Sequence, residues 1–136
     1  MARIGKYNPE ADTFRAPLAA AYTAPLVSTL PVGVVLAVSL NTSGRAVLGS
    51  TGGTAGLGRV GVIVPTRNMA AGEMIDVFTG GEIEEFGIGA DGTTAAAAGT
   101  RYYGVAASGA MSATAAGNDN IGHTVEATRL VIGVGR

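Results

Sequence analysis

The spacing of short apolar runs constrains the fold of this chain more than any other feature. The runs are rich in β-branched residues, and turn-forming Gly, Pro, Asn and Ser separate them roughly every ten residues. No window shows the regular apolar period of an amphipathic helix. We therefore expect an all-β protein, a small Gly-rich β-barrel or sandwich of about seven or eight short strands.

The clearest strand is Val32–Leu40, a continuous apolar run (VGVVLAVSL) that is typical of a buried strand. Ala46–Leu48 is expected to pair back against it across the turn Asn41-Thr42-Ser43-Gly44. Residues 124–127 and 130–134 form the last expected strand pair. The segments that read as loops by composition are 49–59, 87–97 and 115–122.

The stretch from Val60 to Phe86 predicts a hairpin at the centre of the chain, with Thr79-Gly80-Gly81 as a three-residue turn. In that register Ile75, Val77 and Ile83 share an inward face, because side chains alternate along a strand. The other face is expected to point outward, and its acidic residues are expected to keep it solvated. It holds Met74, Asp76, Phe78, Glu82, Glu84 and Phe86. The pattern recurs 27 or 28 residues later, where residues 98–114 predict a second hairpin with a turn at Ser108-Gly109.

Composition limits the chemistry and the partners that are available. The chain has no Cys, which excludes disulfides and thiolate metal sites. Its net charge of −1 gives no positive surface for nucleic acid or an anionic membrane. The N-terminal residues MARIGKYNPEADTFR lack the apolar segment of a secretory signal, and no apolar run reaches the ~18 residues of a membrane span. We expect a soluble protein, made in the cytoplasm, with no nucleic-acid or membrane partner.

Residues 1–31 are expected to be an extended N-terminal arm, and residues 32–136 a single β-barrel or sandwich domain. Four prolines between Pro9 and Pro31 interrupt any helix or central strand in the first segment. Such a segment buries too little apolar surface to offset its ordering entropy alone. We expect the arm to be mobile until a partner captures it.

Two sequence patterns suggest catalysis or cofactor binding, and neither has the context it needs. Gly56-Leu57-Gly58-Arg59-Val60-Gly61 matches G-x-G-x-x-G, but a Gly-rich loop precedes it and a β-branched run follows, where a dinucleotide site needs a strand and then a helix. His123 is the single histidine. Its possible triad partners, none of which lies in a nucleophile elbow, are Ser108, Ser112, Asp91 and Asp119.

Two clusters suggest binding rather than catalysis. Glu82 and Glu84 share a strand face with Asp76, but no apolar surroundings raise a carboxyl pKa there, so a solvated face or acidic contact patch is expected. Tyr102 and Tyr103 could stack on bases or sugars, but adjacent residues point to opposite faces of a strand. We expect one tyrosine in the core and one at an interface, and no catalytic, cofactor or metal site.

The repeated pattern Ala-Gly-x-x-apolar-x-apolar…Gly, seen in AGEMIDVFTGGEI and in AGTRYYGVAASGAM, resembles the small β-rich head decoration (cement) proteins of tailed phages, the lambda type among them. The Pro-punctuated arm and the Cys-free, Ala/Gly/Thr-rich composition are similar too. The resemblance implies a structural virion protein without catalytic residues. It further implies homotrimers at three-fold positions outside an expanded capsid, with the major capsid protein as partner and arms that reach the shell.

We expect the arm, residues 2–30, to add a strand to an exposed edge of the capsid protein. Its capsid-contact side chains are expected to be Tyr7, Phe14, Arg15, Leu18 and Tyr22. The alternatives are a tail or head-fibre module of a phage and, in a different class, a small carbohydrate-binding module that stacks sugars on Tyr102 or Tyr103.

Overall fold

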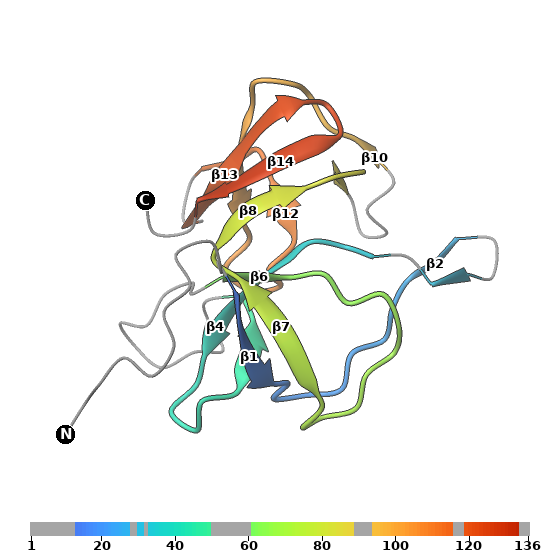
Figure 1. Cartoon of the computed structure of the whole chain (residues 1–136), viewed down its shortest axis with the longest axis vertical. Helices are drawn as coiled ribbons and strands as arrows, with labels where there is room; N and C mark the ends of the chain where they lie inside the picture. The colour runs from blue at the N-terminus through green and yellow to red at the C-terminus, as the bar shows by residue number, and fades with distance from the viewer. Residues whose placement is uncertain are drawn as a thin grey trace.

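The computed structural model describes residues 13–27, 30–31, 33–49, 61–88, 94–115 and 119–133. Within these ranges the chain forms fourteen strands, many of them very short, and no helix. Two five-stranded antiparallel sheets account for most of them and lie one above the other in Figure 1. The prediction of an all-β sandwich is confirmed. None of the described residues belongs to a helix long and apolar enough to cross a membrane.

The first sheet occupies the lower half of Figure 1. Its strands, in spatial order, are β1 (Thr13–Pro17), β7 (Met74–Phe78), β6 (Gly61–Ile63), β4 (Leu36–Leu40) and β5 (Ala46–Leu48). β4 and β5 form the expected hairpin, with Ser39 opposite Val47. Its turn is closed by the Asn41 side chain, whose Oδ1 accepts hydrogen bonds from the backbone N–H groups of Ser43 and Arg45.

The second sheet occupies the upper half of Figure 1. Its strands, in spatial order, are β12 (Met111–Ser112), β11 (Arg101–Gly104), β13 (Asp119–Glu126), β14 (Arg129–Gly133) and β8 (Gly80–Ile83). The hairpin predicted around Ser108-Gly109 is present, because β11 pairs with β12 and the Val105 N–H donates to the Ala110 carbonyl. The predicted C-terminal pair is also present, with Thr124 opposite Leu130.

Two small ribbons complete the described fold. β2 (Leu26–Val27) pairs with β3 (Leu30–Pro31), and β9 (Gly87–Ile88) pairs with β10 (Thr94–Ala95). The second ribbon and the start of β13 at Asp119 lie in segments that sequence composition assigned to loops. Composition failed for the ribbon because a two-residue ladder needs no long apolar run. Most of the remaining predicted loop, at residues 49–59, lies outside the described residues.

The apolar residues form two separate cores. The first is enclosed by the first sheet, and the second lies between that sheet and the other one. β4 serves both, because Leu36 and Val38 join the first core while Ala37 joins the second. A strand that is buried on both faces has no polar alternation, which explains the continuous run in the sequence. The fully buried β6 divides in the same way, with Ile63 in the first core and Val62 in the second.

The predicted central hairpin is wrong, because β7 and β8 belong to different sheets and do not pair with each other. β7 pairs with β1 and β6, whereas β8 pairs with β14. Ile75 and Val77 are buried in the first core as expected, but Ile83 packs against the second core. The chain crosses between the sheets after Phe78, so the Gly-rich segment is a crossover rather than a hairpin turn. The two Ala-Gly patterns therefore start similar strands but do not build a repeated unit.

The prediction that residues 1–31 form a separate arm is also wrong for the part that the structure describes. β1 pairs with β7 along its whole length, from Thr13 opposite Phe78 to Pro17 opposite Met74. β1 is an edge strand, where proline is tolerated because no ladder partner needs its missing N–H. Beyond it, the Ala19 N–H donates to the Ala46 carbonyl at 2.9 Å, which links the end of β1 to β5 at the other edge of the same sheet. Residues 1–12 lie outside the described residues.

Candidate interaction surface

The side chains proposed to contact a capsid do not form one surface. Leu18 is buried in the first core, with 3% of its surface exposed. Phe14 and Tyr22 are half-buried and pack against the same core, and burial raises the pKa of the Tyr22 phenol. Arg15 points outward and forms an ion pair with Asp76, with 3.2 Å between Nε and Oδ1. Tyr7 lies outside the described residues.

The possible catalytic groups are not brought together in the described part of the chain. His123 is exposed on β13, where it lies opposite Arg101 on one side and Val131 on the other. Ser112 lies on the edge strand β12 opposite Tyr103 of β11, whereas His123 lies opposite Arg101 of the same strand. Asp91 is outside the described residues, and they contain no group of three or more His, Asp or Glu side chains that could hold a metal ion.

The G-x-G-x-x-G match opens a strand and not a helix. Its last glycine, Gly61, begins β6, and the other five positions lie outside the described residues. A Cβ at Gly61 would lie 2.6 Å from Val77 Cγ1 and 2.7 Å from the Phe78 carbonyl oxygen. This glycine is therefore explained by the close approach of β6 to β7, which leaves no room for a side chain.

The tyrosine pair does not form a stacking platform. Tyr102 is buried in the second core, where its ring meets Phe86 edge-on with 5.2 Å between ring centroids. Its hydroxyl accepts a hydrogen bond of 3.1 Å from the Ala97 N–H. Tyr103 is half-buried on the opposite face of β11. The expectation of one tyrosine in the core is confirmed, and the carbohydrate-binding alternative loses one of its two candidate residues.

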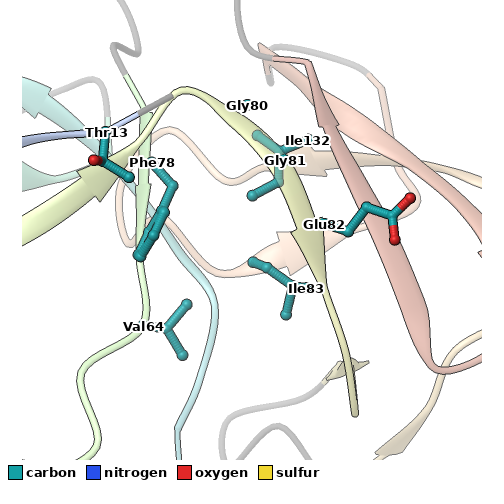
Figure 2. Close-up of a pocket in the computed structure, with 8 residues that line it drawn as sticks. All are labelled: Thr13, Val64, Phe78, Gly80, Gly81, Glu82, Ile83 and Ile132. Atoms are coloured by element: carbon teal, nitrogen blue, oxygen red, sulfur yellow. The ribbon is translucent and has the colours of Figure 1, made fainter. Parts of the chain in front are cut away.

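An apolar groove lies at the crossover between the sheets. It has a volume of about 380 Å³. Figure 2 shows Phe78 and Val64 on the side of the first sheet, facing Ile83 and Ile132 on the other side. The remaining lining residues are Thr13, Gly80, Gly81 and Glu82. The crossover creates this groove because it separates two strands that a hairpin would have held side by side.

An acidic hollow of about 280 Å³ lies just beyond the end of β8. Its lining residues are Glu84, Glu85, Glu126, Thr128 and Arg129. Arg129 forms ion pairs with Glu126 at 3.3 Å and with Glu82 at 3.7 Å. Within the described residues no ion pair involves the exposed carboxylates of Glu84 and Glu85, so the hollow carries uncompensated negative charge.

Glu85 also has an unusual backbone, with φ of 55°. This left-handed conformation is unfavourable for residues other than glycine. The next residue explains it: the Phe86 N–H donates to the Thr128 carbonyl, and the Phe86 ring is buried in the second core. The backbone at Glu85 is thus a tight turn that the core packing of Phe86 holds in place.

Sequence reasoning missed the groove because it assigned Phe78 to a wet outer face together with acidic residues. That assignment mixed Phe78 and Phe86 with Asp76, Glu82 and Glu84. Two large aromatic residues among carboxylates were the available signal that the two halves of the stretch do not share one face. In the structure Asp76 is exposed on β7, whereas Phe78 turns towards the second core.

No protein-family model matches this sequence, and no curated protein matches it. A solved structure from Mycobacterium phage Patience is similar to it. The TM-score is 0.69 at 21% sequence identity, and the alignment covers 98% of this chain and 96% of the other. At this identity the similarity establishes a shared fold, and it extends over nearly the whole of both chains.

Proposed function

We propose that this chain is a structural protein of a phage virion that decorates the outside of the capsid and binds the major capsid protein. The observation that carries the proposal is the shared fold with a protein from Mycobacterium phage Patience, which covers nearly all of both chains. The more specific role, capsid decoration, comes from the resemblance of the sequence to the head decoration proteins of tailed phages.

The surface of the described fold is compatible with binding rather than catalysis. The groove at the crossover is apolar and lies at a sheet edge, a position suited to an extended partner segment. Most of the buried apolar residues in the described part of the chain belong to the two cores. We therefore propose a non-enzymatic protein that acts through its outer surface.

The proposed arrangement is a homotrimer at three-fold positions of the expanded shell. Three copies that each bind a neighbouring capsid subunit gain avidity, because one trimer engages several weak sites at once. Leu18 is enclosed in the protein's own core and Arg15 forms an ion pair with Asp76, so we propose that the capsid contact lies elsewhere on the described surface.

The test is to mix the purified chain with expanded empty capsids and to sediment them, with unexpanded procapsids as the control. We expect the chain to co-sediment with expanded capsids and to have the mass of a trimer in solution. Binding to purified tails but not to capsids would favour the tail or fibre module instead. Failure to bind either would refute the proposed function.

A further inference from the structure

β8 is an edge strand whose second side is unpaired within the described residues. It pairs with β14 from Leu130 opposite Ile83 to Gly133 opposite Gly80, and the second sheet ends there. On an edge strand, about half of the N–H and C=O groups point away from the sheet and remain available to another chain. Proteins commonly protect such an edge with charge, a bulge or a covering segment. Gly80 and Gly81 bring no side chain that would block it.

The open side of β8 faces the apolar groove. Figure 2 shows β8 with β14 on one side and with Phe78 and Val64 across the groove on the other. A strand added to β8 would place every second side chain towards this groove, because side chains alternate along a strand. A Cβ at Gly81 would meet nothing within 4 Å, so the space above this glycine is open. The edge thus offers backbone hydrogen bonds and apolar contacts together.

The charge at the end of β8 identifies the chemistry of the occupant. Directly after Ile83 the chain enters the acidic hollow, where Glu84 and Glu85 lack ion-pair partners among the described residues. Elsewhere on the described surface, Asp76 and Glu73 each pair with an arginine. A segment that follows β8 would therefore gain from apolar residues beside the groove and from a Lys or Arg beside Glu84.

We infer that the β8 edge binds an extended segment of the capsid protein by strand addition, with alternate apolar side chains in the groove and a basic residue against Glu84 and Glu85. The inference rests on the proposed function for the identity of the partner. It reverses the direction of strand addition expected from the sequence, since here the decorating chain supplies the edge and the shell supplies the strand.

The test uses the full-length chain and three variants in co-sedimentation with expanded empty capsids. Glu84→Lys reverses an exposed charge next to the edge, and Ile83→Lys places an ammonium group at the groove. Asp76→Lys makes the same charge change on β7 and serves as the matched control, because that side chain is also exposed. We expect Glu84→Lys to weaken capsid binding about tenfold or more and Asp76→Lys to leave it unchanged. Ile83→Lys should abolish binding.

Amide hydrogen exchange provides a readout that a simple loss of folding would not produce. On capsid binding, exchange of the β8 amides from Gly81 to Ile83 should slow, whereas exchange in β5 should not change. Because Ile83→Lys also disturbs the second core, Glu84→Lys decides the matter if the first variant does not fold. Normal binding by folded Glu84→Lys, or no protection of β8, would overturn the inference while leaving the proposed function intact. Failure of the unaltered chain to bind capsids would overturn both.

Discussion

Replacing Leu18 by Ala tests directly whether the first part of the chain belongs to the β-domain. Leu18 lies just beyond β1, is 3% exposed and packs in the first core. The substitution removes three carbon groups, worth about 0.8 kcal/mol each in transfer free energy, and leaves a cavity that adds to the cost. The wall beside Leu18 is not tight, because a hollow of about 190 Å³ lies between it and Leu48. We therefore expect a loss near the lower end of the Leu-to-Ala range, about 3 kcal/mol.

The assay is urea unfolding followed by circular dichroism, with Leu26→Ala as the matched control. Leu26 lies eight positions further along the same segment and is 64% exposed. Its truncation should change the free energy of unfolding by about 0.5 kcal/mol or less. For Leu18→Ala, the expected loss moves the urea midpoint down by roughly 1–3 M at the usual slope for a small domain. A loss below about 1 kcal/mol for Leu18→Ala would refute the placement of this segment in the core.

Three further predictions concern single side chains. Thr124→Val should lower the free energy of unfolding by about 1–3 kcal/mol in urea, because the buried Thr124 hydroxyl donates to the Ala97 carbonyl and accepts from the Thr100 N–H at 3.1 Å; an unchanged midpoint would contradict it. Glu85→Gly should raise that free energy by up to about 1 kcal/mol, because glycine relieves the left-handed backbone; destabilisation would show that the side chain has another role. The Ala70 N–H and, secondarily, the Arg67 side chain lower the pKa of Glu73 below its usual 4.5, so its stabilising effect is present above that pH and is lost as the pH falls through the lower folded value. The unfolding temperatures of Glu73→Gln and of the unaltered chain should therefore converge as the pH falls from about 6 to about 3. A constant difference between the two temperatures would contradict the linkage.

The sequence predicted the features of the fold that depend on local patterns. Burial of Ile75 and Val77 followed from alternation, which holds whatever strand lies alongside. The hairpins at residues 41–45 and 108–110 followed from turn residues that close locally: Gly44 and Gly109 both have positive φ. These interactions are encoded within a few neighbouring residues, so a single sequence is enough to find them.

The features that failed depend on partners distant in the sequence. β7 could pair with the next run, as predicted, or with β1, and only the packing of the whole chain selects β1. The same choice moves residues 13–18 from an arm into the sheet. Pro17 had argued against a strand, but the rule applies to central strands and β1 is at an edge. The groove beside β8 could not be predicted from the sequence for the same reason, because it exists only where β7 and β8 separate.

The most direct test of the proposed function is an electron cryomicroscopy difference map of expanded empty capsids with and without the purified chain. We expect additional density on the capsid exterior at the three-fold positions, large enough for three copies of the β-sandwich, with the β8 edge against the shell. A map without added density, or with density confined to the tail attachment site, would contradict it.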